Sequence, residues 1–478
     1  MPTIPKQLLV LASVLYAGLL TAAPAPLQPL SRAQRQELAA EVLADRDMAE
    51  VLEKARALLR TGLTAGSGYG EVWIRDLNTS IEVSLEVNPP GQLRGALLRF
   101  LSFQGANGEV PDGYIPREKA SVGYQYRTSP LAPGFLAHKN TVETDQESSL
   151  VLAVRKFIAI TGERTILREG VDGRTVIERL DLALQYVLNE RFDRGKGLVW
   201  GATTADWGDV QPEHEWGVEF DATSHRACDI YDNALYLSAI DALLEMLPPE
   251  SPRAGHWRQI HRSLKRRVRT QLWDSRRQKF IPHLYLAGSP FPSDFDESVV
   301  YYHGGTAVAV EAGLLSRAEI AASLESMRRN VRAAGAASIG LTLQPAYPKG
   351  FFKNPGMGPY SYQNGGDWCW FGGRMVQQLA RNGFVREAYE ELRPMVVRVR
   401  VHGDFREWWS VDNQPRGSRQ FRGSAGVLGR AIEMLRAWAE AEQSTGRSSR
   451  RGGRPEGGDA ERGRILGVAG VTRLPTLC

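Results

Sequence analysis

A carboxylate beside tryptophan occurs at two distant places in this chain. Asp206 and Asp209 flank a Trp-Gly pair, and Glu407 precedes two tryptophans about 200 residues later. Next to an indole the pKa of a carboxyl group can rise, so that it acts as a general acid near neutral pH. Either motif alone also fits a turn with a structural tryptophan. Their joint occurrence predicts two carboxyl groups that share one acid–base site.

Residues 361–370, which read SYQNGGDWCW, have the composition of a wall for a polyhydroxylated ring. The indole of Trp368 can stack on the C–H face of such a ring, and Gln363, Asn364 and Asp367 can hydrogen-bond to its hydroxyl groups. The Gly-Gly pair lets the backbone come close to a ligand. The alternative is a tight turn that caps a helix whose tryptophans belong to the core.

Other loops carry further candidates for substrate contacts. Trp73, Arg75 and Asp76 stand at the start of a helical pattern, where an Arg–Asp pair could hold two hydroxyl groups. An aspartate in a first helical turn is also favoured by the helix dipole alone. Tyr114 follows a Pro-Asp-Gly turn and is a possible pocket wall. His303 precedes two glycines, a setting more typical of a helix cap or a hydrogen-bonded pocket residue than of a catalyst.

These motifs lie in connections between predicted helices. Apolar residues recur with helical spacing in about twelve segments, whereas strand signals are sparse and short, near 198–200 and 280–285. The predicted helices span 33–61, 75–87, 91–106, 143–162, 174–191, 229–247, 254–273, 303–313, 316–331, 364–381, 384–398 and 422–442.

The lengths of the connections alternate between short and long. Short links of two to six residues join the second helix to the third, and likewise the sixth to the seventh, eighth to ninth and tenth to eleventh. Short links produce antiparallel hairpins, so the long links emerge together on one face. Twelve helices arranged as six hairpins predict an all-α fold, the (α/α)6 toroid, with a pocket at the rim formed by the long loops.

Composition is that of a soluble globular protein, with 478 residues of which 42% are hydrophobic and 24% charged. Much of the net charge of +5 lies in residues 446–478, where seven arginines outnumber three acidic residues. We therefore predict no nucleic-acid binding, a single catalytic domain over 30–445, and a disordered Gly/Arg-rich tail over 446–478.

The N-terminus has the pattern of an export signal. Lys6 precedes an apolar run over 8–20, and small residues follow it at a possible cleavage point. This predicts a cleaved signal peptide over 1–25 and a secreted or exported protein with no membrane association afterwards. The alternatives are an uncleaved leader or anchor, although the run is short for a membrane span, and a cytoplasmic protein.

No cofactor or metal is predicted. The three cysteines form no CxxC pair, and the eight histidines show no paired spacing typical of a metal site. The chain also contains no phosphate-binding GxxxxGK[ST] loop and no HExxH motif.

Four segments in this order resemble the six-hairpin glycosidases: WIRDL (73–77), DWGDV (206–210), YQNGGDWCW (362–370) and the stretch from REWW to GSAG (406–426). The resemblance covers roughly residues 65–435 and includes neutral/alkaline invertases, trehalases and the glucosidase and debranching-type relatives. It is nearest to the invertase type. In the invertases, however, arginines follow the mid-chain aspartate, where this chain has Val-Gln, and this difference counts against sucrose.

The resemblance implies a glycosidase in which Asp209 is the general acid and Glu407 the general base. Asp206 is the rival for the acid role, because the spacing within DWGD is ambiguous. Hydrolysis of an α-glucoside or a sucrose-like di- or oligosaccharide by inversion is the expected reaction, for which two carboxyl groups roughly 6.5–9.5 Å apart are typical. The expected substrate contacts are Trp73, Arg75, Asp76, Tyr114, Trp207, His303, Gln363, Asn364, Asp367, Trp368 and Trp408.

Three alternatives remain. A phosphorylase on the same barrel would need a basic site for phosphate near the acid, such as His303 or Lys349. A polysaccharide lyase would use Tyr, His and Arg rather than two acids. A non-catalytic carbohydrate-binding protein would bind sugar without turnover. The oligomeric state cannot be predicted from these features.

Overall fold

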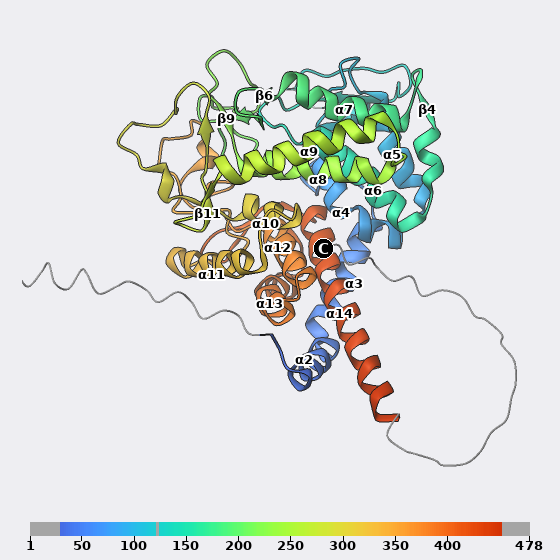
Figure 1. Ribbon diagram of the computed structural model, residues 1–478, viewed down its shortest axis with the longest axis vertical. Coiled ribbons are helices and arrows are strands. Elements are labelled where there is room, and N and C mark those ends of the chain that lie inside the picture. The colour runs from blue at the N-terminus through green and yellow to red at the C-terminus, as the bar shows by residue number, and fades with distance from the viewer. Residues whose placement is uncertain (1–28, 121–123, 452–478) are drawn as a thin grey trace, which may run out of the picture.

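The computed structural model describes residues 29–120 and 124–451, with side chains as far as residue 445 (Figure 1). The predicted signal peptide therefore lies outside the described residues. The last helix, α14 (Arg422–Arg451), extends into the segment predicted as a tail, and the rest of that segment also lies outside the described residues. None of the helices in the described ranges is both long and apolar enough to cross a membrane.

Six helices form a closed inner ring. Each packs against the next along the chain, and the last packs against the first, which closes the ring. Its members are α4 (Ile74–Val87), α6 (Gln146–Thr161), α8 (Ile230–Met246), α10 (His303–Glu311), α12 (Cys369–Arg381) and α14.

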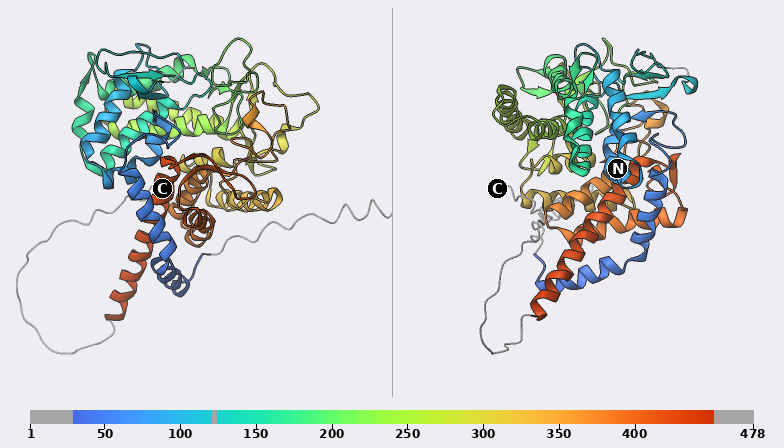
Figure 2. Two further views of the ribbon diagram at one scale, coloured as in Figure 1. Left: turned by 180° about the vertical axis from the view of Figure 1, so that it is seen from behind. Right: turned by 90° about the vertical axis from the view of Figure 1, so that its right-hand side faces the viewer.

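An outer helix accompanies each inner one. Five outer helices follow their inner partners as hairpins: α5 (Pro90–Ser102), α7 (Val176–Glu190), α9 (Pro252–Gln271), α11 (Arg317–Ala334) and α13 (Val385–His402). The sixth, α3 (Arg46–Leu59), comes from the start of the chain and packs against α14 at its end. An additional helix, α2 (Arg32–Ala44), lies beside the projecting part of α14 (Figure 2).

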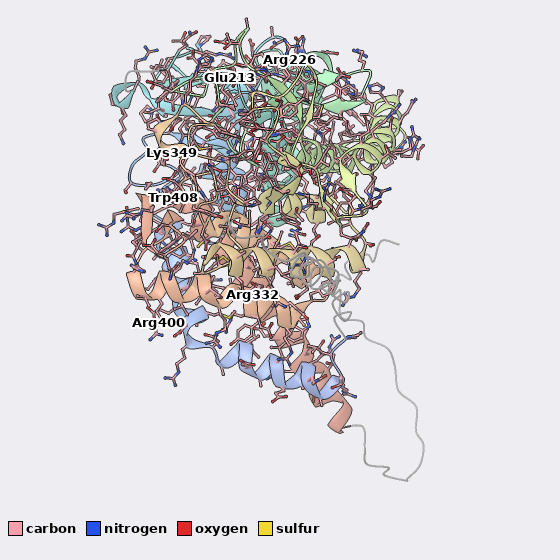
Figure 3. All side chains as sticks on the ribbon, turned by 90° about the vertical axis from the view of Figure 1, so that its left-hand side faces the viewer. Glu213, Arg226, Arg332, Lys349, Arg400 and Trp408 are labelled. Atoms are coloured by element: carbon pink, nitrogen blue, oxygen red, sulfur yellow. The ribbon has the colours of Figure 1, made fainter. Side chains whose placement is uncertain are left out.

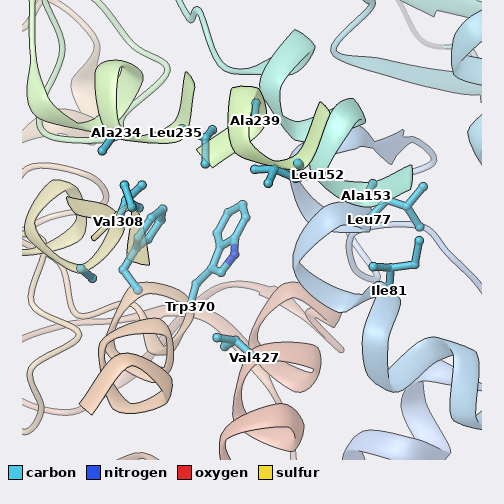
Figure 4. Close-up of a cluster of buried hydrophobic side chains, with 14 of the residues drawn as sticks. Leu77, Ile81, Leu152, Ala153, Ala234, Leu235, Ala239, Val308, Trp370 and Val427 are labelled. Carbon is cyan, nitrogen blue, oxygen red and sulfur yellow. The ribbon is translucent and has the colours of Figure 1, made fainter. Parts of the chain in front are cut away.

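The centre of the ring is filled with side chains from all six inner helices. Figure 4 shows Leu77 and Ile81 of α4, Val308 of α10 and Val427 of α14 around the indole of Trp370, together with Leu and Ala side chains of α6 and α8. Trp370 is 3% exposed. The ring is therefore a packed core and not a channel, and any pocket must lie at one end of it.

Short strands stiffen the long loops at that end. One sheet joins β1 (Val72–Trp73), β2 (Gly113–Pro116) and β3 (Phe135–His138), and another joins β8 (Gly201–Ala202), β9 (Arg226–Cys228) and β12 (Leu284–Tyr285). The remaining pairs are β4 (Gly170–Val171) with β5 (Arg174–Thr175), β6 (Phe192–Asp193) with β7 (Leu198–Val199), β10 (Trp273–Asp274) with β11 (Lys279–Phe280), β13 (Tyr301–Tyr302) with β14 (Leu343–Gln344), and β15 (Arg406–Trp409) with β16 (Pro415–Arg419).

Several predicted helix boundaries were wrong, and two of these errors concern the architecture and the site. The segment predicted as one helix over 33–61 is two helices, because Asp45 ends α2 and caps α3 by accepting a hydrogen bond from the backbone N–H of Met48 (3.0 Å). The helix predicted from 364 begins only at Cys369. The preceding residues form turns, with a positive φ at Tyr362 (47°) and Gly365 (92°), and the backbone N–H and C=O of Asp367 pair with those of Trp409 (both 2.8 Å).

Candidate active site

A pocket with a volume of about 230 Å³ lies at the end of the ring where the inner helices begin. Every inner helix starts at this end, so the residues just before the N-termini of α4, α6, α12 and α14 all reach the pocket. The lining side chains are Ala65, Tyr69, Trp73, Arg75, Asp76, Asp112, Tyr124, Glu143, Trp207, Asp209, Val210, Trp216, Val218, Asn354, Tyr362, Gln363, Trp368, Trp370, Glu407 and Phe421.

Glu407 is held on one wall by two hydrogen bonds. The hydroxyl of Tyr69 donates to Oε1 (2.8 Å), and the backbone N–H of Ser418 donates to Oε2 (2.7 Å). The Ser418 contact depends on Gly417, where an added Cβ would lie 2.5 Å from Glu407 Oε2. Burial raises the pKa of Glu407, and the nearby charge of Asp209 raises it further. The two predicted catalytic carboxylates therefore lie close enough to influence each other.

Asp209 is held on another wall by Gln363. The side-chain amide of Gln363 donates to Asp209 Oδ1 (2.6 Å), while its carbonyl oxygen accepts from the backbone N–H of Asp209 (3.2 Å). This reciprocal pair fixes both the loop and the carboxyl plane. Oδ2 has no hydrogen-bond partner within the described parts of the chain, so it is the oxygen available to a ligand.

The deep end of the pocket is polar and strongly acidic. Arg75 is the one cation among the described residues that line it, and it is already paired with Glu143 and with Asp145 (2.6 Å). Asp76 is 7% exposed, and its Oδ1 is buried without a hydrogen-bond partner in the described part of the chain. Burial raises the pKa of Asp76 to about 7 and also raises the pKa values of Glu143 and Asp112 well above the ordinary range. An unpaired buried carboxyl oxygen is costly without a ligand, which points to hydroxyl groups as its partners.

Aromatic rings form the remaining walls. Trp207 lies edge-on to Trp368 with ring centroids 4.7 Å apart, and it stacks on Phe371 at 4.4 Å. The indole N–H of Trp207 is buried and has no partner within residues 29–120 and 124–445. Together with Trp73 and Trp370 these rings give the pocket an aromatic lining, which suits a sugar ring.

Asp206 does not line this pocket. Its backbone has a positive φ of 56°, and its two carboxylate oxygens accept hydrogen bonds from the backbone N–H groups of Gly304 (2.6 Å) and Gly305 (2.7 Å). It thus caps the start of α10 from a distant loop. A Cβ on Gly304 would lie 2.2 Å from the ring of Trp207, so only glycine fits there. Of the two aspartates in DWGD, only Asp209 faces the ligand space.

Two polar residues of the 361–370 segment also have structural partners. Asp367 is fully buried and accepts hydrogen bonds from Arg398 (2.9 and 2.7 Å) and Ser338. Asn364 bonds to the backbone N–H and C=O of Tyr347. Neither lines the pocket, so the expectation that they bind hydroxyl groups was wrong. Gln363 and Trp368 do line it.

Three more expected contacts lie elsewhere. His303 is buried between the carbonyl of Ile339 (3.2 Å) and Asn330 (3.1 Å), and burial lowers the pKa of its imidazole to about 4. Tyr114 packs on Phe100 behind the pocket. Trp408 does not line the pocket that its neighbour Glu407 lines, and its ring packs edge-on to that of Tyr362 (centroids 6.3 Å apart) near the edge of the molecule in Figure 3. The alternation of side chains along β15 explains this, since successive residues of a strand face opposite sides.

The sequence predictions missed several lining residues. Tyr69 and Asp112 lie in the same two loops as Trp73 and Tyr114, and Glu143 just precedes α6. The other members of this group are Ala65, Tyr124, Val210, Trp216, Val218, Asn354, Tyr362, Trp370 and Phe421. Their one shared signal is position, because nearly all lie in long loops that precede inner helices.

The basic phosphate site that a phosphorylase would need is not formed by the described residues that line this pocket. Neither His303 nor Lys349 lines it, and Arg75 is fully engaged by two carboxylates. A phosphate would therefore meet five lining carboxyl groups and no unpaired cation among the described residues. The lining carboxyl groups are those of Asp76, Asp112, Glu143, Asp209 and Glu407.

The sequence matches no protein-family model and no curated protein. Similar solved structures include the GH63 mannosylglycerate hydrolase from Thermus thermophilus in complex with glucose (TM-score 0.58, 15% identity) and in complex with Tris and D-glycerate (0.59, 16%). An uncharacterized conserved protein from the same organism is also similar (0.58, 17%). Each comparison covers 80% of this chain and 99% of the other. The chain therefore has the six-hairpin fold of these structures, and the all-α toroid predicted from the link lengths is confirmed.

Proposed function

We propose that this protein is a glycoside hydrolase that cleaves an α-glucoside or a related di- or oligosaccharide with inversion at the anomeric carbon. The observation that carries the proposal is the meeting of Asp209 and Glu407 in one aromatic pocket, each with its carboxylate fixed by a separate hydrogen-bond partner. Their positions correspond to the acid and base implied by the resemblance to six-hairpin glycosidases.

In this proposal Asp209 is the general acid. The Gln363 amide occupies Oδ1, so the proton is carried on Oδ2 and passes to the glycosidic oxygen as the C–O bond breaks. The reciprocal bond to the backbone of Asp209 keeps the carboxyl group from rotating. Trp207 and Trp368 pack against the sugar ring while this happens.

Glu407 is the general base. It removes a proton from a water molecule that attacks the anomeric carbon from the opposite face of the ring. The Tyr69 hydroxyl and the Ser418 N–H hold its carboxylate and leave the remaining lone pairs free for that water. Asp76, with its unpartnered buried oxygen, accepts hydrogen bonds from hydroxyl groups of the glycone.

A panel assay tests the proposal directly. The purified protein is incubated with trehalose, sucrose, maltose, isomaltose, mannosylglycerate and short oligosaccharides, and the released sugar and its first-formed anomer are followed by NMR. We expect hydrolysis of at least one neutral glycoside, with the anomer opposite to that of the substrate. Mannosylglycerate belongs in the panel because it is named for the structural neighbours.

Two substitutions assign the roles. Glu407→Gln is expected to lower kcat by at least about 1000-fold on every substrate, because the base is lost. Asp209→Asn should lower kcat by a similar factor on disaccharides but far less on a glycosyl fluoride, since fluoride leaves without protonation. Full activity of Glu407→Gln would overturn the proposal, and tight sugar binding without turnover in the wild type would favour a non-catalytic binding protein.

A further inference from the structure

The active-site pocket continues into a neighbouring cavity at its open end. A second cavity with a volume of about 360 Å³ shares Tyr124 and Val218 with the active-site pocket, so the two adjoin. We call it the mouth cavity. Its other lining residues are Gln125, Tyr126, Arg127, Lys139, Thr141, Glu219 and Phe220.

The exposure of the lining side chains shows which end of the active-site pocket is closed and which is open. Asp76, Trp368 and Trp370 close the deep end and are each less than a tenth exposed. Trp216, at the mouth, is 52% exposed and is the one aromatic among the strongly exposed large apolar side chains of the described residues. Its ring lies 5.8 Å from that of Tyr124. A glycone must therefore sit at the deep end with its leaving group directed past Trp216 toward the mouth cavity.

The two cations in the mouth cavity are already paired, and its one lining carboxylate is that of the exposed Glu219. Arg127 forms an ion pair with Glu109 (2.5 Å), and Lys139 forms one with Glu147 (2.8 Å). The described residues around the cavity consequently offer no unpaired cation to select an anion. The other lining groups that can contact a ligand are the aromatic rings of Tyr124, Tyr126 and Phe220 and the polar side chains of Gln125, Thr141 and Glu219. Rings beside uncharged and acidic hydrogen-bonding groups suit a neutral polyhydroxylated ligand.

We propose that the mouth cavity is a binding subsite for a neutral sugar ring, the second ring beyond the bond that is cleaved. The ring next to the cleaved bond stacks on Trp216 and Tyr124, and the following ring enters the mouth cavity beside Gln125. The preferred substrate is then an oligosaccharide of three or more rings cut from its non-reducing end. This inference rests on the proposed glycosidase activity.

A chain-length series tests it. The probes are α-glucosyl fluoride, which has no leaving sugar, the α-glucosyl disaccharide that the panel identifies as cleaved, and its trisaccharide homologue. With the wild-type protein we expect kcat/KM for the trisaccharide to exceed that for the disaccharide by about tenfold, the gain typical of one stacked and hydrogen-bonded group.

Two variants locate the gain. For each oligosaccharide, kcat/KM is divided by the kcat/KM for the fluoride. Trp216→Ala should lower this ratio by about tenfold for both the disaccharide and the trisaccharide. Gln125→Ala should lower that ratio severalfold for the trisaccharide alone. Both side chains are exposed, so the variants should fold. Val401→Ala is the matched control, because Val401 is 71% exposed on α13 and lines neither cavity.

The outcomes separate the two proposals. If the disaccharide is hydrolysed but the trisaccharide is no better, the subsite is overturned and the glycosidase proposal stands. If Gln125→Ala affects the two oligosaccharides equally, the subsite is again overturned. If wild-type protein hydrolyses neither the fluoride nor any oligosaccharide, both proposals fail together.

Discussion

Tyr69 sets the protonation of Glu407 as well as its position. Its hydroxyl donates to Oε1, and such a bond favours the charged form of the carboxylate. Burial acts in the opposite direction and, being larger, raises the pKa of Glu407 above that of an ordinary glutamate. A base works only when ionised, so we expect kcat/KM to fall as the pH drops through this raised pKa.

Replacing Tyr69 tests that balance. In Tyr69→Phe the stabilising donor is lost, the pKa of Glu407 rises further, and the acidic limb of the pH–rate profile should move upward by about one unit. Tyr362→Phe is the control, because Tyr362 lines the same pocket but its hydroxyl makes no hydrogen bond to Glu407. An identical shift in both variants, or none in Tyr69→Phe, would contradict the assignment.

Asp76 illustrates a cost that the site imposes on stability. Its folded pKa of about 7 lies above the value of roughly 3.9 expected in the unfolded chain. The folded state therefore binds the proton more tightly, and the contribution of Asp76 to stability declines as the pH rises from about 4 to about 7. The cause is burial next to other carboxylates, only partly offset by Arg75.

Asp76→Asn should accordingly separate stability from activity. The asparagine stays neutral, so the variant should be more stable than the wild type by a few kcal/mol at pH 8 and nearly equal to it at pH 4. Urea unfolding at both values measures the difference. Activity should fall sharply, because the amide cannot accept the same hydroxyl hydrogen bonds. The account would be contradicted if the free energy of unfolding of the variant, minus that of the wild type, were smaller at pH 8 than at pH 4.

Among the elements, the segment before α12 is the one that joins the two halves of the site. Gln363 holds Asp209, while the backbone of Asp367 pairs with Trp409 on β15, the strand that carries Glu407. The carboxylate of Asp367 in turn is fastened to Arg398 of the outer helix α13, with both side chains fully buried. A buried ion pair that loses one partner leaves an uncompensated charge.

Asp367→Asn should therefore destabilise the fold by about 3–5 kcal/mol in urea unfolding at pH 7. The matched control is Asp47→Asn, which breaks the exposed pair with Arg400 and should cost less than about 1 kcal/mol. Equal effects of the two substitutions would argue against the structural role. A change in KM with unchanged stability would instead restore Asp367 as a substrate ligand.

At the scale of the whole molecule, the fold was more predictable than the site. The helical period and the alternation of short and long links are repeated around the ring, so errors such as the missed break at Asp45 did not change the outcome. The choice of Asp206 or Asp209 as the acid was supported by no pattern that is repeated elsewhere in the chain. It depends on a positive φ at Asp206 and on the distant backbone of Gly304, which sequence spacing does not reveal.

The misplaced residues share a physical reason. Long loops without regular structure must satisfy their own backbone groups, and polar side chains such as Asn364 and Asp206 do this work. Ligand-binding residues are drawn from the same residue types in the same loops. The sequence therefore identified the loops that form the site, but not which of their polar side chains turn inward.

The closure of the ring by α3 and α14 has a consequence for how the protein is made. Both strands of the Glu407 hairpin and the helix that seals the barrel follow every other element in the chain, whereas Tyr69 and Asp76 precede most of them. During synthesis the early hairpins emerge with one flank of the ring open, and we expect Glu407 to reach Tyr69 only when α14 docks against α3 and α4. The acid–base pair proposed for Asp209 and Glu407 can therefore form only after α14 has been synthesised.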